Sequence, residues 1–174
     1  VTEGSGDEAA STFKVGWSCK KGLKPESPNQ DDFCIICADG TRIYGVFDGH
    51  GPCGHDVSNF VQLTLSRNFA QHAQFREDPE KALSNAFTQT QSQCMQCQSE
   101  GLLDCSLSGT TATLALHRDG ILYVAHVGDS RAVLAKSQDG QLEAEDLTRD
   151  HKPTCETERS RIETAGGEFR RLEG

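Results

Sequence analysis

Val46-Phe47-Asp48-Gly49-His50-Gly51 joins a strand pattern to a helix pattern. Two apolar residues lead into a carboxylate and a glycine, and apolar residues at helical spacing follow. The Asp48 carboxylate is a hard oxygen donor of the kind that Mg²⁺ and Mn²⁺ prefer, and glycine at position 49 lets the backbone come close to an ion. Histidine is the side chain type that titrates near neutral pH, so His50 is a candidate acid or base.

An ordinary hairpin turn is the alternative interpretation of this stretch. Asp-Gly between strand-like runs is a strong hairpin signal, and the chain has three further examples. These pairs are Asp39-Gly40, Asp119-Gly120 and Asp139-Gly140. Asp48-Gly49 differs from them because a helix pattern comes next. On spacing alone, a turn and a functional site are equal alternatives.

The segments around Asp39-Gly40 predict a β-hairpin. Residues 33–38 form the first strand of this hairpin, and residues 42–47 form its returning strand. Asp31-Asp32 comes just before the first strand, and Asp48 comes just after the second. Because antiparallel pairing places these two ends side by side, we expect the carboxylates to meet at one rim of a sheet. Neighbouring carboxylates at this spacing could share metal ions.

The rest of the chain predicts an α+β protein of antiparallel sheets with helices packed on a face. Residues 1–11 form a loose polar lead-in, and residues 13–18 suggest a first strand. Two amphipathic helices are expected, one from Gly54 onward and one with Asp78 as its N-cap. The later expected elements are a meander of strands over 110–116, 121–127, 131–136 and 142–147, and a helix capped by Thr154 and ended by Gly166-Gly167.

The charge balance limits the classes of partner. The 174 residues include 17 Lys and Arg against 26 Asp and Glu, which gives a net charge of −9. This acidity argues against a nucleic-acid surface. No apolar run is long enough for a membrane span or a signal peptide, so no membrane partner is expected. The length fits one domain.

Eight cysteines leave two interpretations open. Nothing in the sequence is typical of a secreted protein, so reduced thiols and a cytoplasmic or nuclear location are expected. Two Cys-x-x-Cys pairs, 34–37 and 94–97, leave a structural zinc site as the alternative. The first pair lies on a predicted strand, where positions three apart face opposite sides, and buried free thiols therefore fit better.

Six stretches, taken together and in order, resemble the metal-dependent serine/threonine protein phosphatases of the type 2C family. They are residues 27–31, 44–51, 108–112, 124–134, 147–153 and 158–167. The resemblance implies a β-sandwich of two antiparallel sheets flanked by helices. Residues 12–174 would be an incomplete N-terminal portion of that catalytic domain.

The resemblance also implies a metal centre that hydrolyses phosphoserine and phosphothreonine in phosphoprotein substrates. Asp31, Asp48 and the Gly49 carbonyl resemble the ligands of two Mg²⁺ or Mn²⁺ ions, and Asp129 resembles a ligand of a third, weaker site. His50 resembles the general acid that protonates the leaving serine or threonine oxygen. A water bridging the metals would attack phosphorus directly, without a phospho-enzyme.

Three features depart from the family pattern. Gln30 stands where many members have glutamate, although the glutamine version also occurs. Glu26 stands where the arginine that binds the substrate phosphate is expected, so Lys24 and Lys21 are the candidate replacements. Two further metal-binding aspartates of the family have no counterpart before Gly174.

The missing aspartates predict a fragment that is inactive alone, while the full-length protein would be a phosphatase. A catalytically silent phosphatase-like module that binds or regulates partners is the alternative function. An incomplete domain would leave a sheet edge and an apolar face uncovered. We therefore expect self-association, or completion by another polypeptide.

Overall fold

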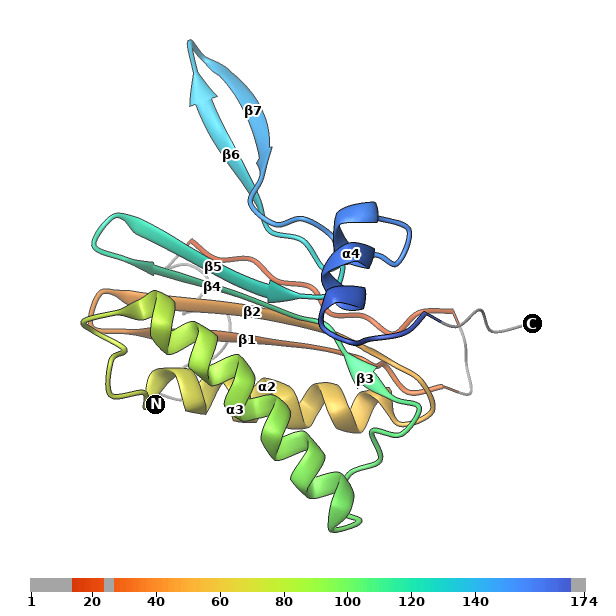
Figure 1. The fold of residues 1–174 in the computed structure, drawn as a ribbon. Helices are drawn as coiled ribbons and strands as arrows, with labels where there is room; N and C mark the ends of the chain where they lie inside the picture. The colour runs from red at the N-terminus through yellow and green to blue at the C-terminus, as the bar shows by residue number, and fades with distance from the viewer. Residues whose placement is uncertain (1–13, 24–26, 170–174) are drawn as a thin grey trace.

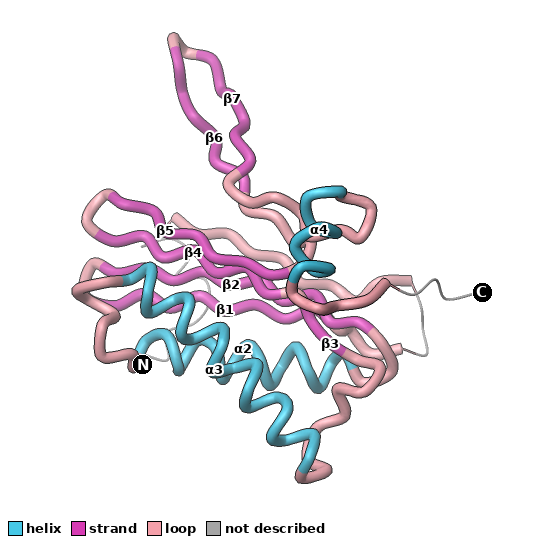
Figure 2. Tube along the Cα trace, in the orientation of Figure 1, coloured by secondary structure: helices cyan, strands magenta, loops and turns pink. Residues whose placement is uncertain are grey.

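Antiparallel strands and helices follow one another in the computed structural model, which describes residues 14–23 and 27–169 (Figure 1). The elements are β1 (Asp31–Ala38), β2 (Thr41–His50), α2 (Gly54–Ala70), α3 (Pro79–Ser99), β3 (Gly109–Thr110), β4 (Ala112–Arg118), β5 (Ile121–Val127), β6 (Val133–Gln138), β7 (Gln141–Asp146) and α4 (Glu156–Thr164). This arrangement confirms the predicted α+β class with antiparallel sheets (Figure 2).

A five-stranded sheet in the order β1-β2-β4-β5, with β3 paired to β2, forms the centre of the structure. Its two hairpins, and the separate β6–β7 hairpin, turn at the three predicted Asp-Gly pairs. In each pair both residues have positive φ, with the aspartates at 48°, 52° and 52°. Positive φ at both central residues is the signature of the type I′ turn. The three turns are therefore confirmed.

The two faces of the central sheet have different surroundings. Helices α2 and α3 cover one face (Figure 1), where Ile43, Phe47 and Leu114 are at most 2% exposed. Since side chains alternate along a strand, Asp48 and His50 lie on the opposite face. There the Trp17 ring stacks on Phe33 with centroids 6.4 Å apart. The candidate residues thus lie on the face that the helices leave open.

Both long helices bury the stripes that the sequence predicts. In α2 the buried residues include Val57, Val61, Leu65 and Phe69. Helix α3 begins with Pro79 at its first position, and the Asp78 side chain accepts a hydrogen bond from the Lys81 N–H at 3.0 Å. Within the part of the chain that the structure describes, neither of these helices nor α4 is long and apolar enough to cross a membrane.

Several predicted boundaries are wrong. Strand β2 continues past Phe47 to His50, because β3 supplies partners for its last two residues. Cys155, and not Thr154, is the N-cap residue of α4. Residues 14–18 form no strand, while Phe13 and the predicted lead-in 1–11 lie outside the described residues.

The predicted meander also breaks after β5. Instead of pairing with β5, β6 pairs only with β7 among the described strands, and this hairpin projects away from the central sheet (Figure 1). The break occurs at Gly128, which has a φ of 96°. A backbone conformation of this kind turns the chain away from the sheet, and the chain then runs through Asp129 to Arg131 before β6 begins.

Candidate metal centre

Asp31 and Asp48 are direct partners in the β1–β2 ladder. Directly paired residues point to the same face of a sheet with their Cβ atoms about 5 Å apart. The predicted juxtaposition of these carboxylates is therefore confirmed. Both side chains line a cavity of about 410 Å³, together with Lys20 and Ser130.

Negative charge accumulates around Asp48. Partial burial raises the pKa of the Asp48 carboxyl, and the charges of Asp31 and Asp129 raise it further, while His50 acts in the opposite direction. Carboxylates that repel one another in this way are stabilised by a divalent cation. The charge pattern and the oxygen donors therefore fit Mg²⁺ or Mn²⁺.

The described residues provide only part of a coordination shell. Within residues 14–23 and 27–169, no three His, Cys, Asp or Glu side chains are grouped closely enough to hold one ion. Mg²⁺ commonly takes only one or two carboxylates and keeps several waters, so the pair Asp31 and Asp48 suits it. A structural zinc takes four ligands, and the described part of the chain brings no three such side chains together, so the two Cys-x-x-Cys pairs do not meet in one site there.

The backbone at Gly49 is enclosed by other backbone. Its N–H donates to the Gln30 carbonyl at 3.0 Å, and the Gln30 side-chain amide donates to the Gly51 carbonyl at 2.8 Å. A Cβ added to Gly49 would lie 2.4 Å from the carbonyl oxygens of both Gln30 and Gly54. Only glycine fits here, and Gln30 has a structural role through these two hydrogen bonds. The Gly49 carbonyl stays a predicted ligand.

Thr111 joins the Asp48 backbone to the turn that carries Asp129. The Asp48 N–H donates to Thr111 Oγ1 at 3.0 Å, and the Thr111 N–H donates to the Asp48 carbonyl at 2.9 Å. The same hydroxyl lies 2.7 Å from Ser130 Oγ. The sequence placed Thr111 in the stretch 108–112 that resembles the family, but only the paired structure shows what its hydroxyl contacts.

Asp129 lies outside the set of residues that line the cavity of Asp31 and Asp48. Its Oδ2 is 3.6 Å from Lys152 Nζ, and that ammonium also lies 2.8 Å from Asp150. Arg131 Nε donates to Asp150 at 2.6 Å. Hydrogen bonds from Arg131 and Lys152 hold the pKa of Asp150 far below its usual range. This alternating chain of charges fixes the turn around Asp129.

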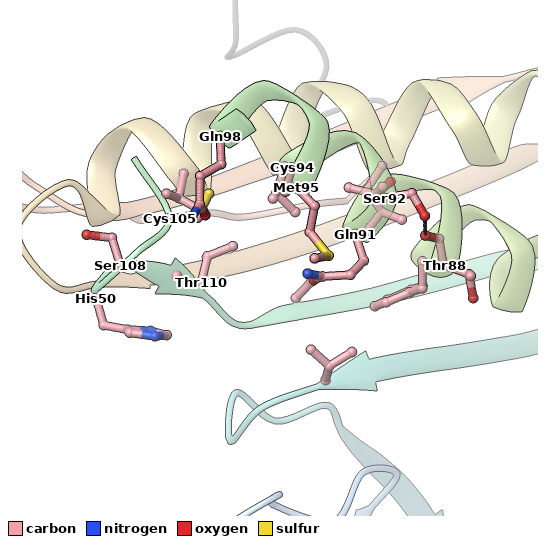
Figure 3. A pocket seen from close by; sticks show the side chains of 18 residues that line it. His50, Thr88, Gln91, Ser92, Cys94, Met95, Gln98, Cys105, Ser108 and Thr110 are labelled. Carbon is pink, nitrogen blue, oxygen red and sulfur yellow. Dashed lines mark hydrogen bonds between the residues drawn. The ribbon is translucent and has the colours of Figure 1, made fainter. Parts of the chain in front are cut away.

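His50 occupies the far end of β2, two residues beyond Asp48. It pairs with Gly109 of β3, and a Cβ added to Gly109 would lie 2.8 Å from His50 Nε2. His50 is exposed at one end of a hollow of about 780 Å³ that Ser108 and Thr110 also line (Figure 3). Glycine at 109 therefore makes room for the His50 imidazole.

Of the two lysines proposed from sequence, the structure tests only Lys21. Lys24 lies outside the described residues, and Lys21 is exposed but does not line the cavity. Lys20 does line it. The segment is held by Cys19, whose Sγ accepts a hydrogen bond from Asn29 Nδ2 at 3.0 Å. Sequence gave no signal that would select Lys20 over its neighbour.

Comparison with known sequences is consistent with this geometry. A family model described as protein phosphatase 2C matches residues 25–174. A probable protein phosphatase 2C from Arabidopsis thaliana is 38% identical over 154 residues, which are 84% of this chain and 43% of that protein. Another from Oryza sativa subsp. japonica is 35% identical over 166 residues, or 94% of this chain and 48% of that protein. The chain thus spans less than half of these relatives.

Two solved structures with a similar arrangement are described as phosphatases. A serine-threonine phosphatase 2C from Toxoplasma gondii superposes with a TM-score of 0.66 at 22% identity, over 79% of this chain and 50% of that one. A serine/threonine phosphatase from Staphylococcus aureus gives 0.62 at 27% identity, over 75% of this chain and 51% of that one. The first similarity is evidence for the fold alone.

Proposed function

Because this chain belongs to the protein phosphatase 2C family, we propose that residues 12–174 form one part of a serine/threonine protein phosphatase domain. The full-length protein would hydrolyse phosphoserine and phosphothreonine in proteins. The observation that supports this proposal most strongly is the pairing of Asp31 with Asp48 across the β1–β2 ladder. Their cavity also contains Lys20, so cation-binding and phosphate-binding groups lie together.

Asp31, Asp48 and the Gly49 carbonyl would hold Mg²⁺ or Mn²⁺, and Asp129 would contribute to a further ion. When bound, the ions supply charge neutralisation for the phosphate and an activated water. Thr111 would keep the Asp48 backbone in place through two hydrogen bonds, at 3.0 and 2.9 Å.

The proton and the phosphate would be handled by residues beside the metal ligands. His50 lies on the same face of β2 as Asp48, and it would donate a proton to the leaving serine or threonine oxygen. Lys20 would bind a phosphate oxygen as a point charge in place of Lys21, while Lys24 stays a predicted candidate. Without that proton, the serine or threonine oxygen is a poor leaving group. His50 and Lys20 would therefore act in the same reaction, one on the leaving oxygen and one on the phosphate.

We infer that the isolated chain is inactive. It covers 43% of the relative from Arabidopsis thaliana, and its described residues bring only two carboxylates together. A catalytically silent module that binds phosphoproteins is the second candidate, because the same cavity could bind a phosphate without hydrolysing it. Turnover distinguishes the two candidates.

Asp48→Asn in the full-length protein tests the proposal. We expect Mn²⁺-dependent hydrolysis of a phosphothreonine peptide to fall at least about 100-fold in kcat/KM, since one shared ligand is lost. Asp39→Asn is the matched control, because Asp39 occupies a hairpin turn of the same Asp-Gly type. Unchanged hydrolysis in the Asp48 variant, or turnover by the 174-residue chain alone, would contradict the proposal.

We also propose that the isolated chain self-associates. The sequence predicted an uncovered sheet edge, and the structure offers a second surface, the face of the sheet opposite the helices. Trp17 and Val46 are 44% and 45% exposed on that face. Contiguous apolar surface of this kind favours association between copies.

A further inference from the structure

We propose that the groove between α3 and the edge strand β5 binds an extended peptide, which adds to β5 as a further strand. The groove lies on the helix-covered side of the sheet, whereas Asp31 and Asp48 lie on the opposite face. The proposal therefore goes beyond the phosphatase activity, and a binding measurement tests it independently of turnover.

Strand β5 is an edge that lacks the usual protection. It pairs with β4 and with no other described strand. Its sequence, Ile121-Leu122-Tyr123-Val124-Ala125-His126-Val127, contains no proline and no Asp, Glu, Lys or Arg. Natural edge strands usually carry such residues, because an unpaired row of N–H and C=O groups recruits other strands. The opposite edge, β1, begins with two aspartates.

Apolar side chains accompany this unpaired backbone. Ile121, Leu122 and Val127 are 52%, 40% and 42% exposed. Alternation along the strand, with Ala125 beside Leu114 in the register, places Tyr123, Ala125 and Val127 on the side of the helices. Backbone and side chains of β5 therefore both present surface that a further strand would bury.

A groove follows β5 from Leu122 to Val127. One hollow of about 630 Å³ lies between residues 122–127 and the α3 residues Glu80, Leu83, Ser84, Phe87 and Thr88. A second hollow, of about 780 Å³, shares Phe87, Thr88 and Val127 with the first and continues to His50 (Figure 3). The two hollows therefore adjoin at these three residues, and the first of them, between α3 and β5, is the proposed peptide site.

The chemistry of the groove selects an extended chain as its ligand. Seven residues of β5 correspond to about 23 Å of strand, which only an extended backbone can follow with regular hydrogen bonds. Leu83 and Phe87 on α3 provide an apolar wall for side chains at alternate positions of the peptide. Such a peptide would resemble the strand-addition ligands of other domains that use a strand and a helix together.

Charge favours a basic peptide over a second copy of this chain. Glu80 is the one formally charged residue among those that line the two hollows. In a pairing of two copies through β5, the added strand would be uncharged and would bring no cation to Glu80. A peptide with apolar residues at alternate positions and a lysine near Glu80 supplies that cation.

The probe is a fluorescein-labelled peptide, Lys-Val-Thr-Val-Thr-Val-Thr-Lys, with amidated C-terminus. Its matched control has the same sequence with N-methyl groups on two valines, which removes backbone donors and keeps the side chains. We expect saturable 1:1 binding of the probe by anisotropy, with amide chemical-shift changes centred on residues 122–127. The N-methylated peptide should bind at least about tenfold more weakly, since lost backbone hydrogen bonds account for such a factor.

Paired variants on α3 locate the binding. Thr88→Trp, or as a second variant Ser84→Trp, fills the groove from an exposed position and should weaken binding at least about tenfold. Gln89→Trp is the matched control, because Gln89 is exposed on the same helix and lines neither hollow. Glu80→Gln should weaken binding of the basic peptide about threefold.

Three results would overturn the proposal. One is no saturable binding of the probe, and another is equal binding of the N-methylated peptide. The third is a dimer of this chain that Thr88→Trp dissociates and Gln89→Trp does not, since β5 would then be the contact between two copies.

Discussion

The atoms around position 49 leave room for glycine and for no larger residue. A Cβ there would meet two carbonyl oxygens at 2.4 Å, and both belong to backbone that cannot rotate away. We expect Gly49→Ala to lower the free energy of unfolding by about 3 kcal/mol, since overpacking against rigid atoms has this magnitude. Urea unfolding measures it, and Gly16→Ala, where nothing lies within 4 Å, is the control. Equal stability of the two variants would mean that the loop relaxes freely.

Asp48 should lower the stability of the metal-free chain. Its folded pKa is raised by burial and by Asp31, so the ionised carboxylate is less favourable in the folded state than in the unfolded chain. Asp48→Asn removes that charge, and we expect a gain in stability below about 1 kcal/mol at pH 7, because the site is open to solvent.

The pH dependence of this gain follows from the direction of the shift. A raised folded pKa means that the wild type loses stability as pH rises above the unfolded value, about 4, toward the folded value. The advantage of Asp48→Asn should therefore vanish below about pH 4. Thermal unfolding of both proteins across pH measures this stability difference. If the variant stays more stable in acid, the gain has a cause other than the Asp48 charge. Added Mn²⁺ should stabilise the wild type more than the variant.

Some residues of the candidate site can be predicted from the sequence, and others cannot. Asp31 and Asp48 are predictable, because the turn at Asp39-Gly40 sets the register that pairs them. Lys20 and Thr111 are not predictable in the same way. Lys20 reaches the cavity through an irregular segment without periodicity, and the partners of the Thr111 hydroxyl are distant in sequence.

Among the elements, the junction between β3 and β4 depends most on one side chain. Thr111 lies between β3 and β4, and its hydroxyl hydrogen-bonds to the Asp48 N–H and to the Ser130 hydroxyl. We expect Thr111→Val to lower the free energy of unfolding by about 2 kcal/mol, because the partly buried Asp48 N–H loses its acceptor. Thr110→Val is the control, since its hydroxyl donates only to the neighbouring Thr111 carbonyl. Chemical denaturation that fails to separate the two variants would exclude this role.

Elements bounded by local signals are predicted well, and those set by long-range pairing are not. Strand β5 has the predicted bounds, since Asp119-Gly120 starts it and Gly128 ends it. Helix α3 starts as predicted because Asp78 caps it. By contrast, β3 is only two residues long, and its partners lie at the end of β2. The separation of β6 and β7 from the central sheet also has no local signal.

Across the whole molecule, the sheet face opposite the helices should govern association. Val46 is 45% exposed there, whereas Leu142 is 78% exposed on the β6–β7 hairpin. If the open face mediates association, Val46→Thr should reduce the fraction of dimer or larger species several-fold, and Leu142→Thr should have little effect. Light scattering coupled to size-exclusion chromatography measures this. A concentration-independent monomer for the unmodified chain would refute the prediction.

The β6–β7 hairpin offers a place to open the chain. Its base is held by the Leu147 N–H, which donates to the Ala132 carbonyl at 2.9 Å, and by Thr148 Oγ1, which accepts from the Ala132 N–H at 3.1 Å. Its tip, Asp139-Gly140, projects from the molecule and contacts no other described element (Figure 1). A fluorescent reporter spliced into this tip, or new chain termini created there by circular permutation, should leave the pairing of Asp31 with Asp48 intact.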